Sequence, residues 1–215
     1  MNKFFLAIFI DLIIIKIMKL IFLMAIAYLA GSVNFAILLF KFLGKDDPRA
    51  SFSGNAGTTN VYRIAGPVWA AVVLLLDVGR AVLLALLSRY LLVPGQVPWV
   101  GLSLIIGNRY PCFHRFQGGK GVATYLGFTA AVAPVGAAIA ALAWVAAYLI
   151  KRVPFIASFV MIGILGFGAI IACRFELAAI IGTVLSVLFI LNGHYKNITE
   201  FMQKKETGKD NQEED

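Results

Sequence analysis

Charged residues are scarce in this chain, and their scarcity excludes most classes of soluble protein. Only 14% of the 215 residues are charged, whereas 60% are hydrophobic and the mean hydropathy is +0.87. Soluble domains carry about 25% charged residues. The composition therefore predicts an all-α polytopic membrane protein, because helices satisfy their own backbone polar groups within a bilayer. No polar stretch is long enough to form a second core, so we expect one domain.

Cysteine and histidine are also rare. Cys112 and Cys173 are expected near opposite membrane faces, so we predict no disulfide between them, and neither has a partner at zinc-ligand spacing. His114 and His194 are too few for a dedicated metal site. The net charge of +8 would suggest a nucleic-acid partner in a soluble protein. Here the basic residues lie between apolar runs, which instead favours topology signals, anionic lipids or an anionic substrate, and no nucleic acid.

Seven apolar runs are separated by polar connections. They cover about residues 20–40, 68–87, 97–106, 122–134, 135–150, 155–173 and 177–191. A perpendicular crossing needs about 20 residues, so the third and fourth runs are too short to cross a full bilayer. We expect these two runs to be half-inserted or packed inside the bundle. The sequence thus predicts a seven-helix bundle with short or partly inserted helices around residues 97–134.

Basic residues fall in alternate connections, which predicts the orientation. Residues 41–67, 107–121, 151–154 and the C-terminal segment hold most of them, whereas the other connections hold only Arg89 and Arg174. Basic connections stay in the cytoplasm. We therefore expect the N-terminus outside, the C-terminus in the cytoplasm, and the two glycine-rich polar segments together at the cytoplasmic face.

The two ends of the chain are less regular. Residues 1–19 contain an apolar stretch too short to span, interrupted by Asp11, Lys16 and Lys19. The role of this N-terminal extension is uncertain, and three interpretations are open. It continues the first helix, lies at the membrane interface, or results from a wrongly assigned start. Residues 20–203 form the transmembrane domain, and the charged residues 204–215 are predicted to be disordered.

One polar segment, residues 53–63, combines glycines, small donors and an arginine. Arg63 offers a bidentate fork for phosphate. The competing interpretation is a helix N-cap, since Ser, Thr and Asn also cap helices; the spacing leaves both open. The candidate binding residues here are Ser53, Gly54, Asn55, Thr59, Asn60 and Arg63.

A second polar segment, residues 116–124, places Gly118, Gly119 and Gly121 around Lys120. Glycines let backbone N–H groups approach an oxyanion, and the ammonium supplies charge. The segment is not a nucleotide-binding P-loop, because glycine rather than Ser or Thr follows the lysine. For Arg109 and Arg115 in the same connection, a topology role is favoured.

Three smaller groups complete the candidate residues. His194 and Asn197 follow the seventh run with i, i+3 spacing, which puts them on one helix face. Asp77 and Arg80 have the same spacing inside the second run, where they form a structural ion pair or take part in a site. Ser32 and Lys41 border the first run as supporting residues.

These motifs together resemble the bacterial acyl-phosphate-dependent glycerol-3-phosphate acyltransferases, the PlsY family, over about residues 30 to 206. Three ordered groups carry the resemblance. They are Gly31, Ser32 and Lys41 with Asp47, Arg49, Ser53–Asn55, Gly57, Thr59, Asn60 and Arg63; Pro111, Phe113, Phe116 and Gly118–Thr124; and His194, Asn197, Ile198 and Glu206.

The resemblance implies a multi-pass protein of the bacterial inner membrane with its active site facing the cytoplasm. It implies transfer of a fatty acyl group from acyl phosphate to the 1-hydroxyl of glycerol-3-phosphate, giving lysophosphatidic acid and phosphate. The counterparts of Ser53, Arg63, Lys120, His194 and Asn197 hold phosphate and shape the reacting centre. No metal, other cofactor or acyl-enzyme intermediate is implied, and we expect a monomer surrounded by membrane lipids.

Several positions depart from the family pattern. They are Asn34, Phe52, Arg80-Ala81, Asn108, Gln117, Glu200 and Lys204. The changes at Gln117 and Glu200 each remove a positive charge. The catalytic set is retained, so our hypothesis is an active but divergent enzyme. The alternatives are a catalytically impaired homologue acting as a membrane scaffold and a transporter of an anionic solute, which would place its site near the midplane and contain an inverted repeat.

Overall fold

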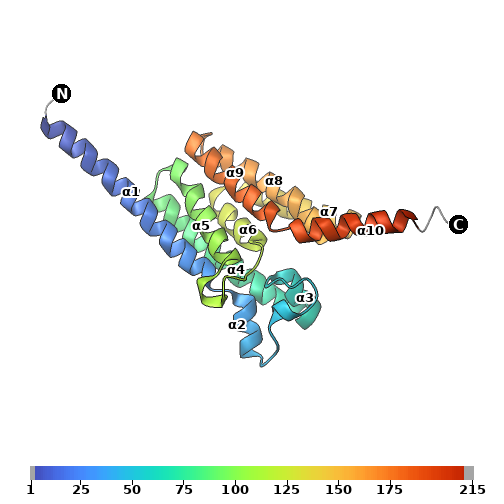
Figure 1. Cartoon of the computed structure of the whole chain (residues 1–215). Coiled ribbons are helices and arrows are strands. Elements are labelled where there is room, and N and C mark those ends of the chain that lie inside the picture. The colour runs from blue at the N-terminus through green and yellow to red at the C-terminus, as the bar shows by residue number, and fades with distance from the viewer. Residues whose placement is uncertain (1–2, 211–215) are drawn as a thin grey trace.

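The computed structural model describes the backbone of residues 3–210 and the side chains of residues 10–203. Every regular element of these residues is helical, as the sequence predicted (Figure 1). The main helices are α1 (Lys3–Ser32), α2 (Phe35–Phe42), α3 (Thr58–Ala65), α4 (Pro67–Leu91), α5 (Val97–Arg109), α6 (Val122–Val132), α7 (Pro134–Lys151), α8 (Pro154–Ala172), α9 (Leu177–Asn192) and α10 (Tyr195–Asp210). Proline occupies the first turn of α4, α5, α7 and α8, where its missing N–H costs no helical hydrogen bond.

The long apolar helices identify an integral membrane protein. Within the described residues, four segments are long and apolar enough to cross a bilayer: residues 10–42, α4, α7 and α8. The pair α9 and α10, bent by 45° at its break, makes a fifth if it is taken as one span, and α6 is a shorter apolar helix. Large apolar side chains such as Leu83, Leu142 and Phe167 are exposed on the outer surface, as lipid contact requires.

Two sequence predictions about the ends of the chain need correction. The first apolar run was expected to be one helix over residues 20–40, but α1 ends at Ser32 and α2 begins at Phe35. Asn34 causes this break, because its side-chain oxygen accepts a hydrogen bond from Ile37 N and caps α2. Residues 204–210 belong to α10 although they were predicted to be disordered, and residues 211–215 lie outside the described part.

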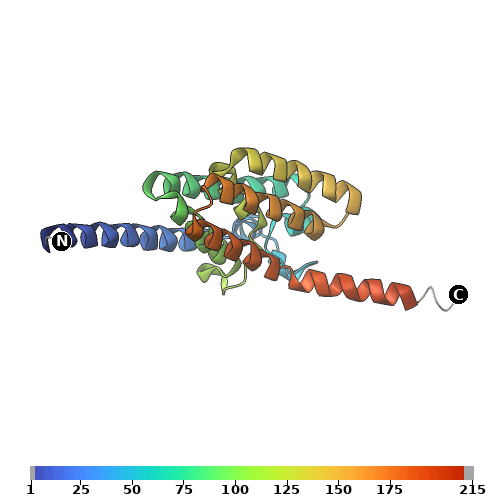
Figure 2. The same ribbon diagram turned by 90° about the horizontal axis from the view of Figure 1, so that it is seen from above.

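The N-terminal extension is the start of the first helix. Residues 3–19 are continuous with the rest of α1, which matches one of the three interpretations drawn from the sequence. The N-terminal part of α1 and the helix α10 project from opposite ends of the bundle (Figures 1 and 2).

Short helices α5 and α6 occupy the interior of the bundle. Val100, Leu104 and Ile105 of α5 are fully buried. Phe128 and Tyr125 of α6 are also buried, each in a different one of two apolar core clusters. This placement confirms that the two runs too short to cross alone are packed inside the protein.

Helices α1 and α5 approach so closely that their contact depends on glycine. A Cβ on Gly107 would lie 2.1 Å from the carbonyl oxygen of Tyr28, and a Cβ on Gly31 would lie 2.2 Å from that of Leu104. Small residues at helix contacts allow such approach in membrane bundles.

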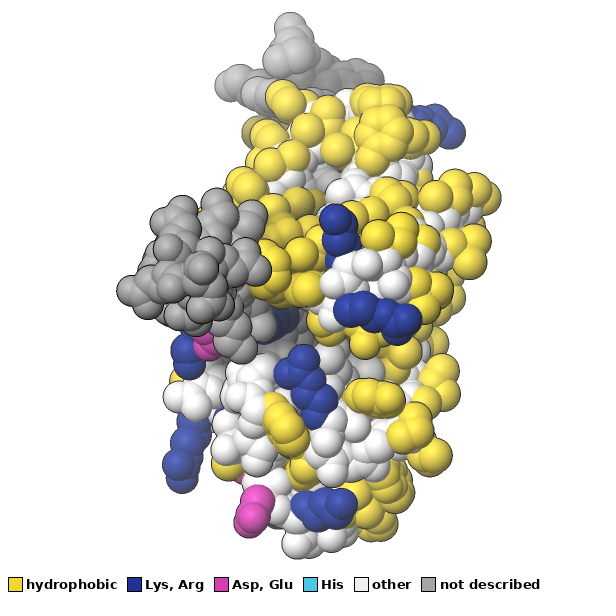
Figure 3. Space-filling view, turned by 90° about the vertical axis from the view of Figure 1, so that its right-hand side faces the viewer, with side chains coloured by type: hydrophobic (Ala, Val, Ile, Leu, Met, Phe, Trp, Pro, Cys, Tyr) yellow, Lys and Arg dark blue, Asp and Glu magenta, His cyan; other side chains and the backbone are white. Residues whose placement is uncertain are grey.

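The helix connections gather at two opposite ends. At one end, Arg89 donates to the carbonyl of Ala131 and Trp99 donates to that of Ala178, and a Cβ on Gly95 would meet the Glu176 side chain. The other end holds the two polar segments, the α7–α8 turn and the α9–α10 break, and we call it the polar end. Figure 3 shows Lys and Arg side chains spread over this end with few Asp or Glu.

A candidate anion site at the polar end

Asn60 organises the first polar segment from inside. Its side chain is buried, and the amide donates to the carbonyls of Pro48 (2.7 Å) and Ser51 (3.1 Å) while its oxygen accepts from the Ser53 hydroxyl (3.2 Å). Asn34 adds a bond from its amide to the carbonyl of Ala56 (3.1 Å). Asn60 does not line the cavity described below, so it shapes the loop rather than facing a ligand.

None of the small polar side chains of this segment caps the helix that follows. The N-cap residue of α3 is Gly57, and no side-chain hydrogen bond caps that helix. The capping interpretation left open by the sequence is therefore not the one that the structure adopts.

Arg49 joins the two polar segments. Its guanidinium contacts the Asp47 carboxylate and donates to the carbonyls of His114 (3.0 Å) and Gln117 (2.8 Å). This pairing lowers the pKa of Asp47, chiefly through the hydrogen bond from Arg49, so the carboxylate stays ionised. The connection between residues 46–53 and 112–118 thus has a fixed geometry.

The second polar segment folds back onto the end of α5. Gly118 N donates to the carbonyl of Arg109 and Gly119 N to that of Asn108, both at 3.0 Å. A Cβ on Gly118 would lie 2.0 Å from the Asn108 carbonyl oxygen, so only glycine allows this approach. Gly121 then adopts φ +84°, a left-handed conformation that favours glycine, and starts α6.

Together these segments enclose one large cavity. Its volume is about 530 Å³, and it is lined by both polar segments and by residues after α9. The polar lining residues are Ser53, Asn55, Thr58, Thr59, Arg63, Asp77, Asn108, Lys120, Thr124, Ser158, His194 and Asn197. Gly121 and the first residues of α6 also face this space, so the N-terminus of α6 supplies backbone N–H groups where an anion would lie.

Lys120 is the cation at the centre of this arrangement. Its ammonium donates to the side-chain oxygen of Asn197, which brings the second polar segment to α10. The pKa of Lys120 is lowered to about 8, chiefly by burial; Glu200 opposes this effect, and the positive charges of Arg63 and Arg109 add to it. An anionic ligand would therefore gain from a cation that is only partly hydrated.

His194 is a neutral imidazole. It lies beyond the end of α9, is 3% exposed, and packs edge-on against Phe159. Burial lowers the pKa of His194 to about 4, with Lys120 and Arg109 contributing. Its Nδ1 lies 3.0 Å from the carbonyl oxygen of Ile190, which can only accept, so Nδ1 carries the proton and Nε2 is left as an acceptor.

Arg109 and Arg80 hold the helices around the cavity. Arg109 donates to the carbonyl of Phe189 (2.8 Å) and the side chain of Asn192 (3.0 Å), which fixes the end of α9. Its role is therefore more specific than the topology role that the sequence favoured.

Arg80 binds the last carbonyls of α1. It donates to the carbonyls of Ala30 (2.9 Å) and Val33 and pairs with Asp77 (2.7 Å), and it also contacts the Thr124 hydroxyl (3.3 Å). One residue of α4 thereby connects the α1–α2 break to the first turn of α6. Asp77 lines the cavity, whereas Arg80 does not.

Most of the sequence-predicted site residues face the same space. Ser53, Asn55, Thr59, Arg63, Asp77, Gly119, Lys120, Gly121, His194 and Asn197 line the cavity, whereas Ser32, Lys41, Gly54, Asn60, Arg80 and Gly118 do not. Ser32 instead receives a hydrogen bond from the Cys112 N–H (3.3 Å), which ties α1 to the second connection.

Sequence reasoning assigned the acyl chain to the apolar helices in general but named none of the residues that line the apolar part of the cavity. Leu74, Leu126, Ala141, Trp144, Val145, Phe155 and Met161 extend the cavity from Lys120 between α4, α6, α7 and α8, and we call this part the apolar arm. Asn108 and Thr124 were also not assigned to the site. Asn108 could have been found, because Asn108 and Arg109 are the polar residues that follow an apolar run. The residues of the apolar arm could not, because in the sequence they do not differ from residues that face lipid.

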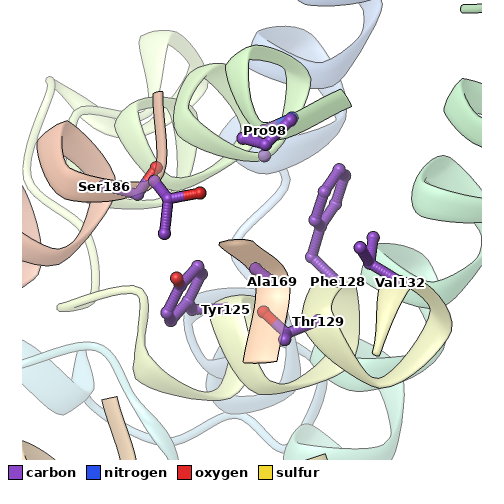
Figure 4. Close-up of a pocket in the computed structure, with 9 residues that line it drawn as sticks. Pro98, Tyr125, Phe128, Thr129, Val132, Ala169 and Ser186 are labelled. Carbon is purple, nitrogen blue, oxygen red and sulfur yellow. The ribbon is translucent and has the colours of Figure 1, made fainter. Parts of the chain in front are cut away.

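A second void lies deeper, between α5, α6, α8 and α9 (Figure 4). Its volume is about 10 Å³, which is at the lower limit for one water molecule. The hydroxyls of Tyr125, Thr129 and Thr183 lie around it without a hydrogen-bond partner among the described residues. Its size excludes a substrate, so the large cavity at the polar end is the candidate site.

The fold and this cavity define an integral membrane protein in which cationic side chains and a hydrocarbon-lined space share one cavity. The family model described as glycerol-3-phosphate acyltransferase matches residues 21–204, and the chain belongs to that family.

Relatives and solved structures agree with this membership. Glycerol-3-phosphate acyltransferase of Pseudomonas aeruginosa (strain LESB58) is 44% identical over 143 residues, which cover 66% of this chain and 76% of the relative. That of Methylobacillus flagellatus is 37% identical over 184 residues, covering 85% and 93%. The fold is similar to a crystal structure of PlsY (YgiH), an integral membrane glycerol 3-phosphate acyltransferase, in its glycerol 3-phosphate form. The TM-score is 0.80 at 30% identity, covering 86% of this chain and 93% of that one.

Proposed function

We propose that this protein transfers a fatty acyl group from acyl phosphate to the 1-hydroxyl of glycerol-3-phosphate at the cytoplasmic face of the bacterial inner membrane. The observation that carries the proposal is the joining of a cationic polar region, which includes Lys120, and an apolar arm in one cavity. An acyl donor needs both kinds of surface, because its phosphate is anionic and its chain is hydrocarbon.

Two phosphorylated substrates repel each other, so the site must offset that repulsion. Arg63, Lys120 and the N-terminus of α6 supply positive charge and N–H donors to the same cavity. Ser53, Asn55 and Asn197 add neutral hydrogen-bonding groups around them. These residues orient the hydroxyl of glycerol-3-phosphate toward the acyl carbonyl and stabilise the charge that develops on its oxygen.

The reaction needs no protein nucleophile. The hydroxyl oxygen bonds to the acyl carbon, the bond from that carbon to the phosphate oxygen breaks, and inorganic phosphate leaves. The hydroxyl proton passes to a phosphate oxygen. His194 positions the acceptor hydroxyl through Nε2, because its pKa of about 4 makes it a weak base.

The apolar arm receives the acyl chain. Its walls come from α4, α6, α7 and α8, and each methylene removed from water there contributes about 0.8 kcal/mol of binding. We propose a monomer as the functional unit.

Seven membrane crossings, with the N-terminus outside and the C-terminus in the cytoplasm, complete the proposal. The termini at opposite ends of the bundle and the basic side chains of the polar end support this orientation.

A comparison of donors tests the proposal directly. The purified protein is reconstituted in vesicles with glycerol-3-phosphate and, in turn, acyl phosphate, acyl-CoA and acyl carrier protein. We expect lysophosphatidic acid only from acyl phosphate. Product from acyl-CoA alone would refute the donor, and no product from any donor would favour the impaired scaffold.

A further inference from the structure

The apolar arm ends at a defined level inside the bundle. Its deepest lining residue on α7 is Ala141, about one turn deeper than Trp144, and its deepest lining residue on α8 is Met161. One turn deeper on the same helices, Ala137 and Leu165 are buried in the closed core against which Trp144 packs. Trp144 and Met161 each lie about two helical turns, or roughly 10 Å, from the α7–α8 turn.

Trp144 is held in one orientation at this level. Its indole N–H donates to the Ser158 hydroxyl (3.2 Å), which in turn donates to the carbonyl of Pro154 (2.9 Å). The indole also stacks on Tyr148 with ring centroids 5.3 Å apart and an angle of 15°. Every polar group of this chain of bonds is paired, so the ring can form a wall of an apolar space without an unsatisfied donor.

Small side chains lie behind the indole. Ala137 and Ala140 of α7 are buried where the arm would continue, and neither lines the cavity. Removing the ring would therefore leave space beside these small residues.

We propose that Trp144, oriented by Ser158, sets the acyl-chain-length preference of the donor. The inference rests on the proposed acyl transfer. A chain that starts with its carbonyl near Lys120 and His194 runs along the arm until its methylenes reach the indole. Further methylenes find no space there, so longer chains gain no additional binding and have to leave the arm sideways.

The experiment measures kcat/KM for a series of acyl phosphates of increasing chain length with glycerol-3-phosphate. In Trp144→Ala, the ratio of long-chain to short-chain kcat/KM should rise about fourfold for each methylene newly accommodated, the factor that corresponds to about 0.8 kcal/mol. Ser158→Ala keeps the ring but removes its hydrogen-bond partner, so it should give a smaller shift in the same direction. Leu142→Ala is the matched control, because Leu142 lies on the same helix and is 72% exposed, outside the arm.

The outcomes separate this inference from the proposed function. A wild-type protein inactive with every acyl phosphate refutes the function. An active wild type with the same chain-length profile in Trp144→Ala refutes the inference, as does a uniform loss of rate at all lengths in that variant. If Trp144→Ala does not fold, Trp144→Leu and Ser158→Ala give the same test, and an unchanged profile in both overturns the proposal.

Discussion

Lys120 donates a hydrogen bond to the side-chain oxygen of Asn197, although the two residues are 77 positions apart in the chain. This contact brings the glycine-rich segment before α6 to the helix after α9 and leaves the ammonium facing the cavity.

The first prediction tests whether the Lys120 ammonium must stay free of a negatively charged protein partner in order to bind substrate phosphate. In Asn197→Asp, a carboxylate would pair with the ammonium and compete with substrate phosphate. We expect KM for glycerol-3-phosphate to rise about tenfold or more, the loss of one charge-assisted hydrogen bond.

The control for this variant lies on the same helix. Thr199 lies outside the cavity lining, and among the described residues its hydroxyl bonds to the carbonyls of Tyr195 and Lys196, so Thr199→Ala should keep the wild-type KM. Equal KM values for Asn197→Asp and wild type would mean that Lys120 does not bind substrate phosphate.

Substituting the cations that line the cavity should reduce activity, whereas substituting other basic residues of the polar end should not. Lys120→Ala and Arg63→Ala each remove a donor to developing negative charge, worth about 2–4 kcal/mol of transition-state stabilisation, or roughly 30- to 900-fold in kcat/KM. Lys151, exposed at the end of α7 and outside the cavity lining, is the matched control. Initial rates of lysophosphatidic acid formation measure all three, and similar rates in all three variants would contradict the assigned site.

The pKa of Lys120 predicts an alkaline limit to activity. Because burial lowers this pKa to about 8, the ammonium is fully charged below that pH and is lost as the pH rises through it. We expect kcat/KM, which reports the free enzyme, to fall above about pH 8. Lys120→Arg keeps its charge throughout this range, so its remaining activity should lack that fall.

His194 should add no transition near neutral pH, since its pKa of about 4 leaves it neutral there. A wild-type profile that stays flat to about pH 10, near the ordinary lysine value, would contradict the role given to Lys120.

Arg80 should matter more to stability than its partner Asp77. Arg80→Ala removes the donor to the α1 carbonyls and leaves the Asp77 carboxylate buried without a counter-charge, a loss of about 3–5 kcal/mol. Asp77→Asn leaves the other hydrogen bonds of Arg80 in place and should cost less. Thermal unfolding in detergent measures both, and an equal loss in the two variants would show that the carbonyl contacts contribute little.

Glycine at the α1–α5 contact should resist even the smallest side chain. In Gly107→Ala, a methyl group would meet the carbonyl oxygen of Tyr28 and force the two helices apart, with an expected loss of about 1–3 kcal/mol of stability. Gly79→Ala on α4 is the control, because nothing lies within 4 Å of the added Cβ. A thermal midpoint for Gly107→Ala equal to that of the control would mean that the contact is looser than described.

Helix positions could be predicted from the sequence because lipid-facing and buried helices are both apolar and end at polar residues or proline. The run predicted over residues 155–173 is α8, Pro154–Ala172, and the run over residues 177–191 is α9. The break at Asn34 could not be predicted, because apolar residues continue on both sides of it. Arg80, 47 residues later in the chain, stabilises that break by binding the Val33 carbonyl.

The roles of some polar residues could be predicted from the sequence, and the roles of others could not. Lys120 and the three glycines around it stood out as an anion-binding pattern, and the structure places Lys120, Gly119 and Gly121 at the cavity. Asn60 is a residue type that often binds ligands. In this structure its amide instead donates hydrogen bonds to the carbonyls of Pro48 and Ser51. A side chain's hydrogen-bond partner depends on backbone groups that neighbouring turns bring to it, and spacing alone does not specify these.

The sequence by itself determined that the chain is a membrane-embedded bundle of helices and that it carries clustered cationic and small polar side chains suited to an anion, because hydrocarbon solvation and the charge of Lys and Arg are local properties. The tertiary structure decided that Arg63, Lys120 and Asn197 share one cavity, that this cavity continues into the apolar arm, and that Lys120 and His194 have lowered pKa values. Those properties depend on which surfaces exclude water from one another, and that follows only from the packing of segments far apart in the chain.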